Sequence, residues 1–274
     1  MFAGKFRPAS AVRIDRRGDD SVEVRAGGEL VEIFEYWRAL REAHEGAVLM
    51  HRGLKYKITK LDLEAKIAEA TLIQTPEYTR STVTRDFWIG EPEHDRTIGR
   101  WRLALGRSRV RSDVVGYKLM RHNEVVSIHD LHLPSVELDT RGLWLTLTNP
   151  DTALLLPERG LLGSLHAAEH ALIHTMPLLA MCDRGDAGGV STLVHPGVDG
   201  PLLLLYDGYQ GGSGIVDEAF SDFDTLIELT LDMVSSCDCG AEGCPRCCYS
   251  KLCGSDNQPM DRLGAIELLN TLRA

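Results

Sequence analysis

The spacing of apolar and polar residues predicts a mainly β first half. Two β-prone runs within residues 46–58 flank the turn-like Arg52-Gly53, which predicts a hairpin. Alternation of apolar and polar positions recurs in residues 66–73 and 109–119, and residues 142–148 are expected to form a last strand. Short strands separated by turn residues favour a small barrel or a curled sheet.

Three other segments of this half follow different patterns. Residues 31–43 space their apolar side chains like a short helix. The polar stretch from Gly90 to Gly99 predicts a loop, which could be mobile, and residues 132–134 look like a connector. These segments divide the predicted strands into groups.

The pattern changes after residue 150. Residues 161–181 predict a long, mostly buried helix, with Ser164 as a candidate cap and a kink at Pro177. Four further elements are expected, two strands and then two helices: residues 190–194, 202–206, 215–234 and 261–272. The expected fold is therefore α+β, with a small β-barrel or curled sheet in residues 1–150 and an α/β part in residues 151–274 that carries a cysteine-ligated zinc loop.

Composition and charge narrow the class of protein. With 43% apolar residues the chain can bury a core, and no run approaches the ~18 apolar residues of a membrane span. The N-terminus shows no apolar signal region, so a cytoplasmic protein without membrane contact is expected. Residues 1–150 carry a net charge of +2 and residues 151–274 a net charge of −12. Nucleic acid, if bound, should therefore contact the N-terminal half, because clustered basic residues supply most of that affinity.

Cysteine provides the strongest chemical signal. Six of the seven cysteines fall within residues 237–253, a density that favours a metal site where disulfides are disfavoured. The two-residue gap of Cys244-Pro-Arg-Cys247 lets both sulfurs reach one ion, and four thiolates suit tetrahedral zinc. Cys239 joins this pair as an expected ligand. The fourth thiolate comes from Cys237 or Cys253, and Cys248 should point away. Unliganded thiols and an iron–sulfur cluster are the alternatives.

The long helix carries a second pattern. His166-Ala-Ala-Glu169-His170 matches the H-x-x-E-H string of inverted zinc peptidases, with Glu169 as the general base. His174 follows one turn later on the same helix face. Short strings of this kind also arise by chance, and apolar helices often bury a histidine bonded to a carboxylate. A buried structural cluster is therefore the favoured interpretation, and a metallohydrolase is the alternative.

Two glycine-rich loops could suggest anion binding. Residues 183–189 and 207–214 hold several glycines, and the second loop joins a buried strand to a helix. It lacks the lysine of a phosphate-binding loop, so tight turns are expected, with Asp183 and Asp207 capping backbone amides. The chain contains no G-x-x-x-x-G-K-[ST] string, and we expect no ATP hydrolysis by this chain alone.

Basic residues gather with aromatic ones in the predicted strands of residues 100–121. The group comprises Arg100, Arg102, Arg107, Arg109, Arg111, Lys118 and Arg121, with Trp101 and Tyr117. Such mixtures suit a nucleic-acid face, and a solvated sheet face is the alternative. Arg107, Arg109 and Arg111 alternate along one strand and should share a face, so these three are the expected DNA contacts.

The order of these motifs carries a resemblance that runs over most of the chain. The matching segments of the first half are residues 46–56, 61–62, 115–118 and 131–134. Those of the second half are residues 165–173, 183–189, 206–214, 237–254 and 260–262. In this order they resemble the C-terminal zinc-binding region, formerly a domain of unknown function, of DExH-box superfamily 2 helicases related to mitomycin repair factor A. Cys248 extends the usual cysteine loop.

The resemblance implies a non-enzymatic accessory domain of a DNA repair helicase. Such a domain would help to engage DNA, which we expect to be single-stranded and to meet the N-terminal half, or would make interdomain contacts. ATP hydrolysis and translocation would come from two RecA-like lobes, in cis or in trans. Zinc is the expected cofactor.

Overall fold

A computed structural model describes residues 21–149 and 160–273. Their contacts form two compact units: residues 21–83 with 113–134, and residues 84–112 with the described residues from 135 onward. The mixture of strands and helices confirms the α+β prediction. A domain boundary near residue 150 lies outside the described residues and stays a prediction. The contacts nevertheless place residues 84–112 and 135–147 with the helical part rather than with the N-terminal strands.

The first unit is built on a five-stranded sheet with the order β2-β1-β5-β4-β3. Its strands are β1 (Ser21–Ala26), β2 (Glu29–Glu35), β3 (Val48–His51), β4 (Leu54–Asp62) and β5 (Ile67–Ile73), and one helix, α2 (Tyr36–Glu42), follows β2. Strands β1 and β5 run parallel, whereas the other pairs are antiparallel. Val22, Val24 and Phe34 of the sheet pack with Ala39 of α2 in one apolar core.

The predicted hairpin is confirmed, and the predicted helix of residues 31–43 is partly wrong. Arg52 and Gly53 adopt positive φ angles of 50° and 80° between β3 and β4, as a two-residue turn requires. Residues 31–35 belong to β2 instead of the helix. The β-branched Val31 and Ile33 favour a strand, and pairing with β1 supplies the backbone partners that a local helix would otherwise provide.

Four strands follow β5 along the chain, and the first two of them are long. They are β6 (Tyr78–Ile98), β7 (Trp101–Arg121), β8 (Glu124–Asp130) and β9 (Val136–Leu147). The loop predicted from Gly90 to Gly99 is wrong, because residues up to Ile98 continue β6 and only the turn at Gly99 remains. Acidic side chains made this segment look like a loop, but Asp95 forms an ion pair with Arg102 of β7, and Glu93 forms one with Arg141 of β9. The connector at residues 132–134 is confirmed.

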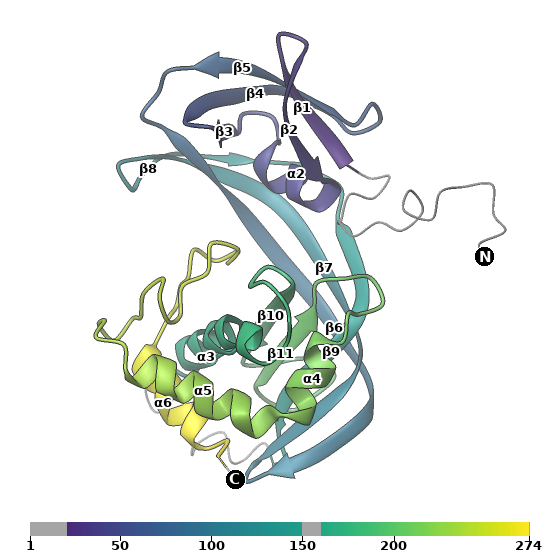
Figure 1. The fold of residues 1–274 in the computed structure, drawn as a ribbon, viewed down its shortest axis with the longest axis vertical. Coiled ribbons are helices and arrows are strands. Elements are labelled where there is room, and N and C mark those ends of the chain that lie inside the picture. Colours follow the sequence, from purple (N-terminus) through teal and green to yellow (C-terminus); the bar gives the residue numbers. More distant parts are fainter. Residues whose placement is uncertain (1–20, 150–159, 274) are drawn as a thin grey trace, which may run out of the picture. The chain divides into compact units, whose positions relative to one another are not determined.

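The second unit combines one sheet with helices (Figure 1). The strand order is β10-β11-β9-β7-β6, and β8, which belongs with the end of β7 to the first unit, pairs with β7 off this path. The remaining elements are α3 (Leu161–Thr175), the 3-10 helix η2 (Met176–Leu178), β10 (Ala187–Thr192), β11 (Leu202–Asp207), α4 (Ile215–Ser221), α5 (Phe223–Ser235) and α6 (Arg262–Asn270). Helix α3 contacts β10, β11, α5 and α6. No helix in the described part of the chain is long and apolar enough to cross a membrane.

Strand β11 is buried along its whole length, because both of its faces are covered. Leu203 and Leu205 lie in the core that includes α3, α5 and α6. Leu202 and Leu204 pack on the other face with Trp144 of β9. Antiparallel partners on both edges, β10 and β9, complete its hydrogen bonding. This continuous apolar strand anchors the helices that carry the candidate site.

The helices predicted in the second half are present, but they begin and end at other residues than predicted. Helix α3 ends at Thr175, Pro177 lies in η2, and Ser164 is buried inside α3 rather than capping it. The helix predicted over residues 215–234 breaks at Asp222 into α4 and α5.

A capping role for Asp207 is confirmed, since its carboxylate accepts the amides of residues 213, 214 and 216. At the other loop Asp186, not Asp183, accepts an amide, that of Asp183.

Candidate metal centre

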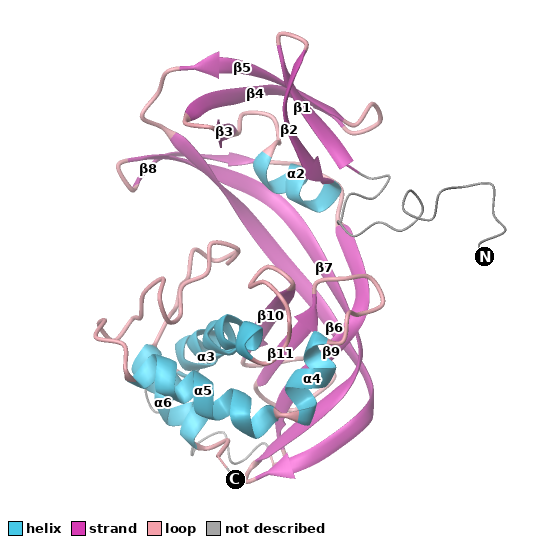
Figure 2. Cartoon of the chain, in the orientation of Figure 1, coloured by secondary structure: helices cyan, strands magenta, loops and turns pink. Residues whose placement is uncertain are grey.

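Residues 236–261 connect α5 to α6 without a helix or strand, as the loop colour of Figure 2 shows. Asp261 caps α6 by accepting the amide of Gly264 at 2.9 Å. The guanidinium of Arg262, only 8% exposed, donates to the carbonyl oxygens of Val234, Cys239 and Gly240 at 2.6, 3.0 and 3.2 Å. We call residues 236–261 the cysteine loop. The buried guanidinium of Arg262 thus holds the first part of this loop against the ends of α5 and α6.

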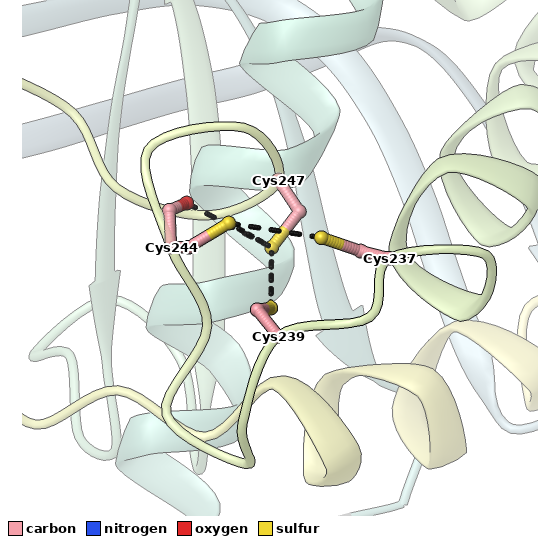
Figure 3. A group of neighbouring side chains, drawn as sticks. All are labelled: Cys237, Cys239, Cys244 and Cys247. Atoms are coloured by element: carbon pink, nitrogen blue, oxygen red, sulfur yellow. Dashed lines mark hydrogen bonds between the residues drawn. The ribbon is translucent and has the colours of Figure 1, made fainter.

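Four sulfurs of the cysteine loop converge (Figure 3). The Sγ atoms of Cys237 and Cys244 lie 3.6 Å apart, those of Cys239 and Cys247 3.5 Å, and those of Cys244 and Cys247 3.9 Å. These distances exceed the ~2.05 Å of a disulfide. A zinc ion with Zn–S bonds of ~2.3 Å separates its sulfurs by about 3.8 Å in a tetrahedron, so the spacing fits this metal. We call these four residues the thiol quartet.

A tight turn at Cys244-Pro-Arg-Cys247 sets the local geometry of the thiol quartet. The carbonyl of Cys244 accepts the amides of Cys247 and Cys248 at 3.1 and 3.0 Å, which closes one turn of chain. Cys247 is fully buried and Cys237 nearly so, whereas Cys239 and Cys244 are partly exposed. Four converging thiols leave no position for water, which is the arrangement of a structural metal site rather than a catalytic one.

A bound cation would also stabilise the ionised form of the thiol quartet. Burial raises the pKa of Cys239 and of Cys247 to about 12. Burial also opposes ionisation of Cys244, but hydrogen bonds led by the backbone amide of Arg246 outweigh it and lower the pKa of this thiol to about 7. Four thiolates so close together repel one another, and a bound dication would offset that repulsion. The donor set and its chemistry therefore fit zinc.

The two remaining cysteines of the loop lie elsewhere. Cys248 is fully buried in the helical core and is not among the four grouped sulfurs, although its thiol interacts with that of Cys247. Cys253 groups with His166 and His170 rather than with the other thiols. Of the two candidates for the fourth position, the structure brings Cys237 to Cys239, Cys244 and Cys247. Spacing alone could not separate Cys237 from Cys253, because the outcome depends on where α5 ends.

The histidine pattern lies on the buried face of α3. His166, Glu169 and His170 are each less than a tenth exposed. Burial raises the pKa of Glu169, and its side chain packs so closely on Gly189 that a Cβ there would lie 2.5 Å from the Glu169 Cγ. His174 lies one turn further on, with its pKa lowered to about 4 by burial. A buried polar cluster describes these residues better than a peptidase site.

Cys253 is the most acidic member of this second group. The pKa of its thiol falls to about 4: burial opposes the change, and hydrogen bonding with His166 and then His170 outweighs burial. The Sγ atom lies 3.4 Å from Nε2 of His166. The sequence had placed Cys253 with the other cysteines, because an i, i+4 histidine pair whose first member lies 87 residues upstream gives no local sign of a thiol partner.

The arginines predicted to touch DNA share one face of β7 but have acidic neighbours. Arg109 forms an ion pair with Asp139 at 2.6 Å, and Arg111 donates to Ser135 at 2.8 Å. The side chain of Arg107 is 90% exposed and lies 3.9 Å from Glu93. The sequence missed these acids because they come from β6 and β9, which are distant along the chain.

Comparison with known proteins gives three findings. The model of a family described as the MrfA Zn-binding domain matches residues 168–248. An ATP-dependent helicase of Bacillus subtilis, YprA, is 28% identical over 262 residues, which cover 92% of this chain and 34% of the helicase. An uncharacterized protein of Methanocaldococcus jannaschii, MJ1572.1, is 32% identical over 114 residues, which cover 39% of this chain and 98% of that protein.

A solved structure shares the fold. The crystal structure of a helicase, MrfA, bound to DNA matches 98% of this chain and 36% of that chain, with a TM-score of 0.68 and 24% sequence identity. The chain thus spans about a third of the length of the helicases that it matches. The thiol quartet ends at Cys247, just inside the segment that the zinc-binding family model covers at its C-terminal end, whereas Cys237 and Cys239 lie well within it.

Proposed function

Because the chain belongs to the family of the MrfA zinc-binding domain, we propose that it is a zinc-stabilised accessory domain of a DNA helicase. The observation that carries this proposal is the thiol quartet, placed in a chain that spans about a third of its helicase relatives. In this proposal Cys237, Cys239, Cys244 and Cys247 hold the zinc. The zinc supplies binding energy that folds the cysteine loop.

The motor activity belongs to another part of the assembly in this proposal. Two RecA-like lobes, in the same chain or in a partner, bind and hydrolyse ATP and move along DNA. The present chain has no G-x-x-x-x-G-K-[ST] string and should not hydrolyse ATP by itself. Its own contribution is to assist DNA engagement or contacts between domains, in the cytoplasm.

The exposed basic face of β7 is the proposed DNA contact. Arg107 is the most accessible of its three arginines, while Arg109 and Arg111 have polar partners that DNA phosphates would have to replace. Few phosphates are therefore neutralised, and binding by the isolated chain should be weak. Single-stranded DNA is the expected ligand, and three neutralised phosphates would give a slope of about −2 in log affinity against log salt concentration.

A charge-reversal experiment tests this contact. Labelled single-stranded DNA is titrated with the wild type and with the triple variant Arg107→Glu, Arg109→Glu, Arg111→Glu, at about 50 mM and about 200 mM salt. The triple variant should lose nearly all binding. The control variant Arg52→Glu, Lys57→Glu, Lys60→Glu changes the net charge equally at exposed positions of the first unit and should keep it. Equal affinities of the wild type and the Arg107 triple variant would refute the contact.

A further inference from the structure

Three metal-binding side chains outside the thiol quartet converge on one point. His166 and His170 lie one helical turn apart on α3, and Cys253 comes from the second half of the cysteine loop. The donor atoms of these three residues lie within 4.8 Å of one another. His166 and His170 are buried, and Cys253 is partly buried. None of the three belongs to the quartet, so the zinc-binding assignment of the chain leaves them unexplained.

The imidazole rings are oriented as metal ligands are. Nδ1 of His166 lies 2.8 Å from the carbonyl oxygen of Pro259, and Nδ1 of His170 lies 2.6 Å from that of Cys248. A carbonyl oxygen can only accept, so each Nδ1 carries a proton, and loss of any Nε2 proton to the incoming metal would leave the Nε2 lone pair as the ligand. Histidines that bind metals usually have this arrangement, in which a carbonyl fixes the tautomer and the ring orientation.

Neighbouring polar groups also contact the sulfur of Cys253. The amide of Asn257 donates to Sγ of Cys253 at 3.3 Å, and the hydroxyl of Ser255 lies 3.2 Å from it. These contacts hold the sulfur in place beside the two imidazoles. The distance of 3.4 Å between this sulfur and Nε2 of His166 also fits a shared metal, since Zn–S of ~2.3 Å and Zn–N of ~2.0 Å at a tetrahedral angle separate the two donors by about 3.5 Å.

From this geometry we propose that His166, His170 and Cys253 bind a second metal ion, and that this ion is zinc. Two imidazoles and one thiolate are borderline-soft donors, which zinc accepts in tetrahedral geometry, with water in the fourth position. The second ion clamps the far half of the cysteine loop to α3, while the quartet holds the near half. Three protein ligands and a water are also the donor count of catalytic zinc sites, but Glu169 is not among the grouped donors and packs against Gly189, so the role of the second ion is to hold the loop. This inference does not depend on any contact with DNA.

Zinc stoichiometry tests the second site directly. The full chain, purified without chelator and desalted, is analysed for zinc by mass spectrometry, and two ions per chain are expected. Cys253→Ala and His170→Gln should each reduce the value to one. The matched controls are Cys182→Ala, a cysteine outside both groups, and His174→Gln, a buried histidine on the same helix, and both should retain two ions. One zinc per chain in the wild type, or two in Cys253→Ala, overturns the proposal.

Cobalt gives a second measurement that does not depend on the stability of the zinc-loaded variants. Cobalt titrated into the metal-depleted chain should bind in two phases, because the sites differ in donors. The quartet should give intense sulfur-to-cobalt charge transfer from four thiolates, and the second site a weaker band from one. Cys253→Ala should lose the weaker phase and keep the intense one. A single phase in the wild type that Cys253→Ala reproduces unchanged contradicts a second site.

Discussion

Two regions of the second unit are stabilised by different physics. Strand β11 is buried along all six residues between two apolar layers and has strand partners on both edges. The cysteine loop of residues 236–261 has no helix or strand and is held by sulfurs, by the buried Arg262 and by histidines bonded to its carbonyls. The stability of the sheet therefore depends on how well buried side chains fill the core. The stability of the loop depends instead on the Arg262 charge, on a bound metal and on the protonation of its cysteines and of the histidines bonded to its carbonyls. Different substitutions should destabilise each region.

The largest effect should follow from removing two members of the thiol quartet. Cys244→Ser with Cys247→Ser leaves too few thiolates for a closed zinc site. We expect a loss of zinc and of roughly 5 kcal/mol or more of folding free energy, because structural zinc contributes about 10–16 kcal/mol of apparent binding energy in small zinc domains. Thermal melting and limited proteolysis measure this, with new cleavage expected between residues 235 and 257.

The matched control for this substitution is Cys182→Ser, which removes a thiol that belongs to neither metal-binding group. It should change neither the zinc that the quartet holds nor the protease pattern. If the double variant melted like the wild type and held the same amount of zinc, the loop would not depend on the quartet.

A cavity in the sheet should destabilise the fold without touching the metal. Leu203 of β11 is fully buried in the core that includes α3. Leu203→Ala should cost about 3 kcal/mol through lost burial and an unfilled cavity. Chemical denaturation measures the cost, and zinc content should stay at the wild-type value. Ile128→Ala, at a position 68% exposed on β8, serves as the control and should cost less than about 0.5 kcal/mol. Loss of zinc in Leu203→Ala would contradict the claim that the two regions are stabilised independently.

An intermediate effect is expected at Arg262, which connects the two regions. Arg262→Ala leaves the carbonyls of Val234, Cys239 and Gly240 without their charged donor. We expect a cost of about 2 kcal/mol, since each such bond is worth more than a neutral one. Arg246→Ala is the control, because that side chain is exposed in the same loop. Equal unfolding free energies for the two variants would show that the buried guanidinium is not needed.

The smallest effect concerns pH in the first unit. His44 is fully buried, its Nε2 has no hydrogen-bond partner among the described residues, and burial lowers its pKa below 6.5. As pH falls below about 6.5 the unfolded chain takes up a proton that the folded chain refuses, so stability decreases toward acid. Denaturation at about pH 7.5 and about pH 5.5 should show a smaller decrease for His44→Phe than for the wild type. An equal decrease in both proteins would exclude this histidine as a source of the pH dependence.

Local chemistry was predictable where all partners lie close in sequence. The spacing of Cys244 and Cys247 indicated a metal site, because two residues between thiols already set their distance. The hairpin at Arg52-Gly53 was predictable for the same reason. The fourth member of the quartet was not, since Cys237 and Cys253 lie on opposite sides of the pair and the choice depends on how α5 ends against α6.

Features that depend on remote partners escaped prediction. The acidic residues of β6 looked like a loop until Arg102 and Arg141 supplied their counter-charges from other strands. The basic face of β7 looked free for DNA because Asp139 is 30 residues from Arg109 along the chain but directly opposite on β9. The buried histidine cluster was predicted, but its thiol partner was not, because Cys253 lies 87 residues from His166. In each case the missing information was tertiary pairing.

The central claim is that four cysteine sulfurs hold one zinc ion in the cysteine loop. X-ray absorption at the zinc edge measures this most directly, and the Cys253→Ala variant isolates the quartet from the second group. The predicted result is one zinc per chain with four sulfur neighbours at ~2.3 Å and no nitrogen or oxygen neighbour. A zinc ion with fewer than four sulfurs, or a Cys253→Ala chain without zinc, would contradict the account.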